Sequence, residues 1–411
     1  MNYFIKNIHI NKLFHLNGID IPIADEKCPH LIITGKNGSG KTVLLNAIAD
    51  FFEIIKNDAS LHFLKYKSAL EYWENQQKNV TAQEEKIRIQ REIDDYKNSI
   101  NRLYGKVEVE SDALVEIVEK YNKGQFVIAF YQADRKVKMS EPKNPTKPVY
   151  NKKGDVKETA TSQFLNFLSD LKIQEALARN EKQTKDADEI NAWFEDFESL
   201  MRQIYQDDNL ALDFNYRDYS FKICTEGKKF KFTEVSDGFA AVLDIVADLI
   251  LKMQDDSSLT RSYQKEGIVL IDEIETHLHL ALQKVIMPLL TKVFPNIQFV
   301  ITTHSPFVLS SMPNAVAYDL EHQEILDNLT EYSYESLAEG YFGVRTESSY
   351  AEMQLATFKK LLAKEELSDA DKVLIKQLKS DFDKIAEVLS PLIVGEFRQI
   401  VIQNAEKLKS L

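Results

Sequence analysis

Apolar runs of strand length recur along the chain, and each is followed by polar or glycine-rich residues. Residues 31–34, 126–131, 268–271 and 297–303 are the clearest of these runs. Strands of a parallel sheet are buried on both faces, so they carry nearly uninterrupted apolar sequence. We therefore expect these four segments to be strands of one sheet. Residues 3–34 as a whole should supply further short strands around a turn.

Between about residues 61 and 103 the chain changes to a charged, helix-forming composition. Thr81 and Glu84 have the spacing of a capping box, and a helix at roughly residues 64–78 is expected before them. Apolar residues then alternate at intervals of four and three, at Ile89, Ile93, Tyr96, Ile100 and Leu103. This heptad seam predicts an antiparallel helical hairpin roughly 30 Å long. A packed helical insertion and a protruding short coiled coil explain the pattern equally well.

The other segments alternate between helical and strand-like patterns. Helices are predicted for residues 43–56 and 163–205, and a hairpin for residues 211–233 with Gly227 near its turn. After residue 320 the chain is mostly helical. We therefore divide it into a head domain at residues 1–55 and 110–320, a helical hairpin insertion at 56–109, a helical insertion at 160–208 and a helical C-terminal region at 321–411.

Composition and charge narrow the classes of function. The 411 residues are 44% hydrophobic and 28% charged, as in soluble globular proteins. A formal net charge of −13 repels phosphate backbones, so contact with DNA or RNA needs a local basic patch. Arg135–Lys153, with seven basic residues and the single acid Glu141, is the candidate. The longest apolar stretch, residues 239–253, is too short to span a bilayer, and no secretory leader is visible; we expect a cytoplasmic protein without membrane contact.

A glycine-rich turn gives the strongest chemical indication. Residues 35–42, Gly-Lys-Asn-Gly-Ser-Gly-Lys-Thr, match the G-x-x-x-x-G-K-[ST] pattern and lie between a predicted strand and a predicted helix. Glycines let backbone N–H groups turn toward phosphates, and the helix N-terminus adds positive potential. Lys41 is expected to act on the β- and γ-phosphates as a catalytic residue, and Thr42 to hold Mg²⁺. The expected ATP-binding residues here are Gly35, Asn37, Gly38, Ser39, Gly40, Lys41, Thr42 and Val43.

Two further predicted strands end in residues suited to phosphate chemistry. Asp272 and Glu273 follow an apolar strand, at the edge where doubly wound sheets bind ligands. Asp272 is expected to hold Mg²⁺ through water, and Glu273 to polarise the attacking water as general base. His304 follows the next strand and can hydrogen-bond the γ-phosphate or that water. Its place after the Asp-Glu strand favours a catalytic role over a structural one.

Ser236 and Gly238 form a second device that can bind phosphate. They lie in Val-Ser-Asp-Gly-Phe, just before the apolar helix-like run 240–251. A serine hydroxyl, a glycine backbone and a helix N-terminus suit a phosphate, although a plain serine N-cap would explain the same residues. One protomer has no use for two such devices on one γ-phosphate. We therefore expect a homodimer in which ATP lies between the phosphate loop of one copy and this helix of the other.

The order GKNGSGKT, VSDGF, IVLIDEIETHLH and FVITTHSP resembles that of ATP-binding-cassette ATPases of the SMC/RecF branch. More narrowly, it is similar to compact bacterial ATPases related to the OLD family and to the ATPase subunits of Septu and retron anti-phage systems. The similarity covers roughly residues 1–55 and 120–320. Asp237 and Phe239 depart from the usual LSGGQ-like signature, but its phosphate-facing serine and glycine are retained.

The resemblance implies a P-loop NTPase fold of the α/β class and ABC/SMC type, with a short coiled-coil hairpin and a helical C-terminal region. It implies that Gln132 senses Mg²⁺ and the γ-phosphate, with Arg135 as an alternative, and that Lys12 or Phe14 touches the nucleotide. The implied activity is hydrolysis of ATP with Mg²⁺ by a dimeric conformational switch. That switch would control a separate effector (a nuclease, toxin or reverse transcriptase) in anti-phage defence, with higher assembly left open.

Other functions fit the residues less well. A GTPase would need an N-K-x-D motif, and residues 151–154 lack its Asp. An OLD-type nuclease would need acids at strand ends, whereas Asp381 and Asp383 lie in a helix-periodic run. His277 and His279 lack partners at ligand spacing, so we expect interface or structural roles for them. A DNA-sensing or DNA-repair ATPase and a low-turnover ATP-dependent scaffold stay open as alternatives.

Overall fold

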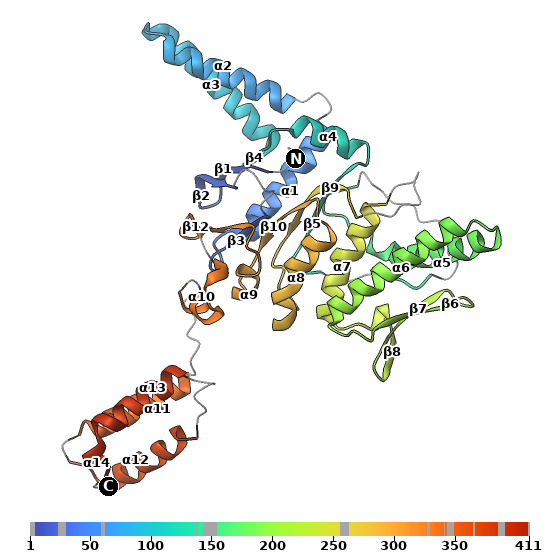
Figure 1. Ribbon diagram of the computed structural model, residues 1–411. Coiled ribbons are helices and arrows are strands. Elements are labelled where there is room, and N and C mark those ends of the chain that lie inside the picture. The colour runs from blue at the N-terminus through green and yellow to red at the C-terminus, as the bar shows by residue number, and fades with distance from the viewer. Residues whose placement is uncertain are drawn as a thin grey trace. The chain divides into compact units, whose positions relative to one another are not determined.

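Six strands form the central sheet of the computed structural model, and five of them are mutually parallel (Figure 1). Strand β12 pairs antiparallel at one edge. The apolar runs expected to be strands lie side by side in this sheet, so the α/β prediction is confirmed. The order across the sheet is β12 (Glu324–Leu326), β11 (Ala315–Asp319), β3 (His30–Thr34), β10 (Ile297–Thr302), β9 (Glu266–Ile271) and β5 (Phe126–Tyr131).

The chain forms two compact units, Met1–Tyr332 and Ser333–Leu411. Strand β12 completes the sheet of the first unit, although helical structure was expected from residue 321 onward. Three residues are too few to show an alternating pattern, which explains the difference. The structure describes residues 5–23, 30–58, 62–135, 139–142, 154–254, 263–326, 329–340, 342, 349–364, 366–384 and 391–409.

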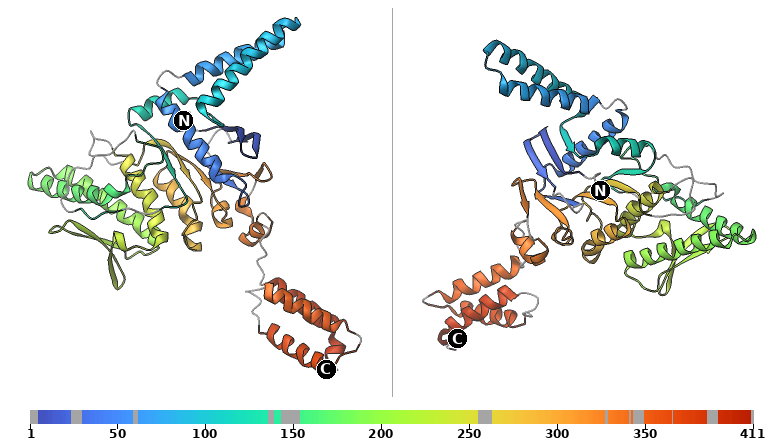
Figure 2. Two further views of the ribbon diagram at one scale, coloured as in Figure 1. Left: turned by 180° about the vertical axis from the view of Figure 1, so that it is seen from behind. Right: turned by 45° about the horizontal axis from the view of Figure 1, so that its top comes forward.

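Helices cover both faces of the central sheet. On one face, α1 (Lys41–Asn57) packs through Ile48, which shares a core with Ile268 of β9. On the other face lie α7 (Asp237–Lys252) and α8 (Leu280–Val293) (Figures 1 and 2). Helix α1 begins inside the glycine-rich turn, and α7 begins in the Ser-Asp-Gly sequence. Both expected phosphate-binding devices are therefore helix N-termini.

A small antiparallel sheet of β2 (Leu16–Pro22), β1 (Asn7–Leu13) and β4 (Val107–Glu110) packs against α1. Next to it, α2 (His62–Asn79) and α3 (Gln83–Tyr104) form an antiparallel helical hairpin that extends away from the central sheet (Figure 1). Gln and charged side chains link the two helices along their length. The helical hairpin expected from the heptad seam is therefore present.

The seam and the start of α3 differ in detail from the expectation. Ile89 and Ile100 are buried, whereas Leu103 is 41% exposed. Helix α3 begins one residue later than a cap at Thr81 requires, and its N-cap is Ala82, which has no side-chain acceptor. The predicted capping box is wrong, because the later start moves the glutamate out of the third helical position.

Two helices and a small sheet precede Ser236. Aromatic rings pack between the helices, such as Phe167 of the first and Trp193 of the second, whose centroids lie 5.5 Å apart in an edge-to-face arrangement. The expected hairpin is a sheet of three strands, and Gly227 forms the turn between the last two with a φ of 74°. These elements are the 3₁₀ turn η1 (Thr161–Gln163), α5 (Phe164–Asn180), α6 (Thr184–Tyr205), β6 (Ala211–Asn215), β7 (Ser220–Thr225), β8 (Lys228–Lys231) and the turn η2 (Phe232–Glu234).

The second unit is helical. Phe358, Phe382 and Phe397 pack together at the centre of its core. Asp381 and Asp383 are exposed and pair with neighbouring lysines, so this D-x-D sequence does not lie at strand ends. The helices of this unit are α10 (Tyr334–Gly340), α11 (Ser349–Leu362), α12 (Asp369–Phe382), α13 (Pro391–Gln403) and α14 (Ala405–Lys409).

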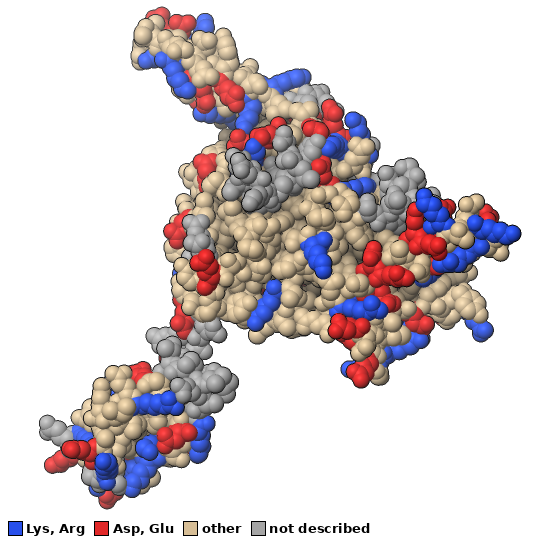
Figure 3. Space-filling view, in the orientation of Figure 1, with Lys and Arg blue, Asp and Glu red and all other residues tan. Residues whose placement is uncertain are grey.

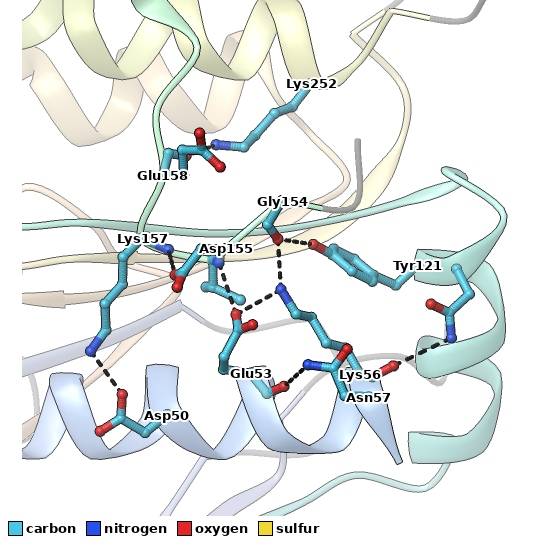
Figure 4. Close-up of polar contacts among 12 residues, drawn as sticks. Asp50, Glu53, Lys56, Asn57, Tyr121, Gly154, Asp155, Lys157, Glu158 and Lys252 are labelled. Carbon is cyan, nitrogen blue, oxygen red and sulfur yellow. Dashed lines mark hydrogen bonds and ion pairs between the residues drawn. The ribbon is translucent and has the colours of Figure 1, made fainter. Parts of the chain in front are cut away.

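The chain just after Gly154 is tied to α1 and to α4 (Leu114–Asn122) (Figure 4). Lys56 Nζ donates a hydrogen bond to the Gly154 carbonyl over 2.6 Å, and Lys157 forms an ion pair with Asp50 at 2.7 Å. The Tyr121 hydroxyl, on α4, donates a hydrogen bond to the same carbonyl. These contacts fix the far end of the helix that begins at the phosphate loop.

Charges of both signs are mixed on the surface. On the face shown in Figure 3, Lys and Arg lie beside Asp and Glu over the α2–α3 hairpin and over α5 and α6. The basic run 135–153, expected to contact DNA or RNA, lies mostly outside the described residues, which include only 135 and 139–142 of it. Among the helices that the structure describes, none combines the length and apolar composition needed to cross a membrane.

Candidate functional site

The carboxyl ends of β3, β10 and β9 meet at one edge of the central sheet. Because β10 lies between the other two strands, His304 at its end lies between the phosphate loop and Glu273. A cavity of about 310 Å³ opens there, lined in part by Glu273 and His304. Six of the expected ATP-binding residues also line it, namely Asn37, Gly38, Gly40, Lys41, Thr42 and Val43.

Glycines give the phosphate loop its shape. Gly35, Gly38 and Gly40 have φ angles of 132°, 87° and 102°, a region that other residues rarely adopt. A Cβ on Gly35 would lie 2.9 Å from Ser39 Oγ, and one on Gly40 would lie 3.0 Å from Leu16 Cδ1. Ser39 Oγ is buried and has no hydrogen-bond partner within the described part of the chain. A buried donor in an inward-turned loop fits a phosphate oxygen.

Lys41 folds back over the loop that precedes it. Its Nζ donates hydrogen bonds to the carbonyls of Gly35 and Lys36, over 2.8 Å and 3.0 Å. Burial lowers the pKa of Lys41, and the carboxylates of Glu273 and Glu275 oppose that shift. The amine therefore lies among backbone and carboxylate oxygens, where phosphate oxygens can replace the loop carbonyls as acceptors.

Thr42 and Asp272 bring oxygen atoms together beside Lys41. Thr42 Oγ1 donates to Asp272 Oδ1 over 3.2 Å, and Thr302 Oγ1 donates to the same oxygen over 2.7 Å. Hydroxyl and carboxylate oxygens are ligands that Mg²⁺ prefers, so this pair fits the expected metal. In the described ranges, no three His, Cys, Asp or Glu side chains gather as metal ligands. Mg²⁺ commonly takes most of its ligands from phosphate and water, so two protein oxygens suffice.

Glu273 has a backbone conformation that is uncommon for a residue with a side chain. Its φ is 43°, a region that costs about 1–3 kcal/mol outside glycine. Its N–H donates to Thr302 Oγ1 over 2.7 Å, and its carbonyl accepts from Arg135 Nη2 and the Thr276 N–H, each over 3.0 Å. The carboxylate accepts one long bond, from Thr276 Oγ1 at 3.4 Å. The peptide is thus fixed while the carboxylate faces the cavity.

His304 is held through its backbone by Glu275. The His304 N–H donates to Glu275 Oε1 over 2.5 Å, and Thr303 Oγ1 donates to Oε2 over 2.8 Å. Burial raises the pKa of Glu275 against these hydrogen bonds. Burial, and after it the Lys41 charge, lower the pKa of His304, which favours the neutral imidazole. A neutral ring can both donate and accept a hydrogen bond at the cavity.

The structure places Lys12 and Gln132 away from this cavity. Lys12 is exposed on β1, and the residues after it, Leu13 and Phe14, line the cavity instead. Gln132 is exposed beyond β5, and β9 and β10 separate that strand from β3. Their expected contacts with nucleotide and metal stay predictions.

Three further residues belong to the site region. His15 lines the cavity, and its Nε2 is 3.1 Å from the Ser39 carbonyl oxygen. Thr302 connects Asp272 with the Glu273 backbone. Arg135, the first residue of the basic run expected to contact DNA or RNA, is 8% exposed and donates to backbone carbonyls. Two of them had an indication in the sequence: Thr302 stands two residues before His304, and Arg135 was named as an alternative to Gln132.

Ser236 and Gly238 lie at the N-terminus of α7 and are not among the residues that line this cavity. Ser236 is an exposed N-cap residue whose side chain makes no capping hydrogen bond. A Cβ on Gly238 would lie 2.7 Å from the His277 carbonyl oxygen, so packing within the chain already requires this glycine. The next residue, Phe239, stacks on Tyr205 of α6 with ring centroids 4.1 Å apart. The Ser236 hydroxyl and the helix N-terminus are therefore available to another molecule.

A family model described as "AAA domain, putative AbiEii toxin, Type IV TA system" matches residues 31–310. The match runs from β3 through α9 (Pro306–Leu309), so it includes the phosphate loop, the Asp-Glu pair and His304. The chain belongs to this family. The predicted P-loop ATPase is thereby confirmed at the level of the family.

Relatives of this AAA-family ATPase include Septu and retron proteins. "Septu protein PtuA" of Bacillus mycoides (strain KBAB4) is 38% identical over 95 residues, which is 23% of this chain and 13% of that protein. "Retron Vc95 probable ATPase" of Vibrio cholerae serotype O1 biovar El Tor is 36% identical over 91 residues, 22% of this chain and 18% of that protein. The predicted similarity to Septu and retron ATPases is confirmed, over a small part of each relative.

Among solved structures, the AAA-family ATPase aligns with an Smc head bound to the C-winged helix domain of ScpA. The alignment covers 79% of this chain and 97% of that chain, with 12% identity and a TM-score of 0.38. At this level of similarity, the fold assignment depends on the family match and on the order of strands in the sheet.

Proposed function

We propose that this chain binds ATP with Mg²⁺, hydrolyses it, and acts as a dimeric switch that controls a partner effector. The observation that carries the proposal is the cavity where Lys41, Thr42, Glu273 and His304 come together. Family membership supports the nucleotide, and the loop geometry supports its phosphates.

Each residue has a task that follows from its position. Lys41 and the loop N–H groups hold the β- and γ-phosphates, and Thr42 and Asp272 hold Mg²⁺. When bound, the cation neutralises charge on the phosphate oxygens. Glu273 faces the cavity from a fixed peptide and polarises the attacking water. His304, neutral and anchored by its backbone, hydrogen-bonds the water or the γ-phosphate.

The second half of the site would come from another copy of the chain. The exposed Ser236 at the start of α7 supports this, because a helix N-terminus carries roughly half a positive charge and suits a γ-phosphate. Loss of that phosphate would remove the contact and separate the two copies. Stacking of Phe239 on Tyr205 would carry the movement of α7 into the α5–α6 insertion.

We place this switch in anti-phage defence, where the copies would control a separate effector such as a nuclease, toxin or reverse transcriptase. The Septu and retron relatives support this setting. The α2–α3 hairpin and the α5–α6 insertion are elements beyond the nucleotide site that could contact such a partner.

Glu273→Gln tests the proposal. The amide keeps the size of the side chain but cannot act as a base, so the rate of hydrolysis should fall roughly 10²- to 10⁴-fold while ATP remains bound. Dimers should accumulate in saturating ATP-Mg²⁺, as measured by light scattering after gel filtration. Glu226→Gln, an exposed glutamate in the β7–β8 turn, is the matched control and should behave as wild type.

A monomeric Glu273→Gln protein in saturating ATP-Mg²⁺ would contradict the dimer. Full hydrolysis by this variant would contradict the role of Glu273. The effector is tested with the same variant, by co-expressing it with the product of the neighbouring gene and assaying that product. If the effector is equally active with the wild-type and the Glu273→Gln ATPase, the chain does not act as a switch for it.

A further inference from the structure

Arg135 is a buried cation whose guanidinium, within the described part of the chain, donates its hydrogen bonds to backbone carbonyls. The residue is 8% exposed. Nη1 donates to the Asp272 carbonyl over 2.9 Å and to the Gln132 carbonyl over 3.3 Å. Nη2 donates to the carbonyls of Glu273 and Ile274, over 3.0 Å and 3.3 Å. One guanidinium therefore connects the chain beyond β5 with the chain beyond β9.

Burial of this charge has an energetic cost that ordinary packing does not explain. Removing a guanidinium from water costs several kcal/mol, and the usual compensation is a carboxylate at hydrogen-bond distance. Here burial lowers the pKa of Arg135, and the carboxylates of Asp244, Glu275 and Asp272 oppose that shift. Within the described residues, none of these carboxylates accepts a hydrogen bond from the guanidinium. The hydrogen bonds instead go to a turn of the main chain.

The geometry of that turn explains what the guanidinium achieves. In an extended strand, successive carbonyls point to opposite sides, so three consecutive ones cannot meet one side chain. The carbonyls of Asp272, Glu273 and Ile274 do meet Arg135, because the backbone turns at Glu273 with a φ of 43°. A planar fork with five donors suits such a set of acceptors, whereas a lysine ammonium presents three donors at one point.

We propose that Arg135 is a positioning residue for Glu273, whose guanidinium holds the turn that directs the Glu273 carboxylate into the ATP cavity. This inference rests on the proposed role of Glu273 as general base. It gives the first residue of the basic run 135–153 a function inside the protein, in place of contact with nucleic acid.

Arg135→Lys and Arg135→Gln test the inference. The first keeps the charge without the fork, and the second replaces both with a shorter neutral amide. A small displacement of a catalytic group can slow the chemical step strongly, so single-turnover hydrolysis should be roughly 10- to 100-fold slower in both variants. Affinity for ATP-Mg²⁺, measured by calorimetry, should stay at the wild-type value, because Arg135 touches neither the loop nor the cavity. Arg179→Lys, at an exposed arginine of α5, is the matched control and should hydrolyse ATP normally.

A double variant separates positioning from general support of the fold. If Arg135 acts through Glu273, Arg135→Lys added to Glu273→Gln should not slow hydrolysis further. The carboxylate that Arg135 positions is already absent from the Glu273→Gln protein. A merely structural residue would lower the rate by the same factor in both backgrounds. Multiplying effects would therefore overturn the proposal, as would a fall in ATP affinity that matches the fall in rate.

The remaining outcomes are also decisive. If Arg135→Lys hydrolyses ATP at the wild-type rate, a positive charge alone is sufficient. That result would overturn the proposed role of the planar guanidinium. Arg135→Gln removes a buried charge, so it is expected to fold and to carry the test if the lysine variant does not. Normal hydrolysis by Glu273→Gln alone would instead defeat the proposed role of Glu273, and this result is distinguishable from a failure confined to Arg135.

Discussion

Lys41 is the residue on which we expect nucleotide binding to depend most directly. Its ammonium makes two hydrogen bonds with loop carbonyls, and phosphate oxygens would take the same donors. Lys41→Ala removes charge-assisted bonds worth about 1.5–3 kcal/mol, so ATP-Mg²⁺ should bind roughly 10- to 100-fold more weakly by calorimetry. Lys36→Ala is the control, because that side chain is exposed and pairs with Glu321 at 2.9 Å. Equal affinity of the Lys41 variant and wild type would contradict the phosphate-loop assignment.

Residues that belong to a local pattern could be predicted, and residues defined by distant contacts could not. Spacing within one turn identifies Lys41 and Thr42, because the loop itself creates the binding geometry. His15, Thr302 and Arg135 bind partners that are 24, 29 and 137 residues away in the sequence. Apart from Thr302, which stands two residues before His304, their neighbours along the chain give no indication of those partners. Arg135 was grouped with a basic run expected to contact DNA or RNA, because a local cluster of positive charge suits phosphate.

Strands β3 and β10 are joined by a buried histidine at their amino-terminal end. His30 accepts a hydrogen bond at Nδ1 from the Phe299 N–H over 3.0 Å, and burial lowers the pKa of His30 to about 4. Between pH 6.5 and pH 4, His30 therefore binds a proton in the unfolded chain but not in the folded chain. The free energy of unfolding should fall by roughly 3 kcal/mol as the pH drops from 6.5 to 4.

His30→Asn tests this contribution, because its Oδ1 can accept the same N–H bond but does not titrate. Urea unfolding at pH 7.5 and at pH 4.5 gives the comparison, and the variant should lose clearly less stability than wild type between the two. Equal losses in the two proteins would show that other groups control the acid sensitivity of the sheet.

Elements were predictable where a long pattern supports them. The four apolar runs gave the core strands of the parallel sheet, and the four-three spacing gave the α2–α3 hairpin. Strand β12 and the start of α3 were not predictable in this way. Tertiary pairing with β11 decides the former, and a single residue at Ala82 decides the latter. Short elements depend on their neighbours more than on their own sequence.

In the proposed dimer, each copy alone would hold an incomplete hydrolytic site. One cavity collects the phosphate loop, Glu273 and His304, while Ser236 stands exposed on another helix. Gly238 has a packing role against His277 in its own chain, so the glycine by itself is not evidence for a second copy. The dimer therefore depends on Ser236 and the α7 N-terminus, and an experiment must separate the two halves of the site.

Mixing two inactive variants does this. Lys41→Ala damages the phosphate loop, and Ser236→Arg places a large exposed side chain on the partner-facing helix. In a head-to-tail dimer of one copy each, one site combines an intact Lys41 with an intact Ser236. An equal mixture should therefore recover up to about a quarter of wild-type hydrolysis, since half of the dimers are mixed and each has one intact site. A mixture of Lys41→Ala with Glu273→Gln is the control, because both residues belong to the same half and no intact site can form. Recovery in neither mixture would show that Ser236 does not complete the site of a second copy.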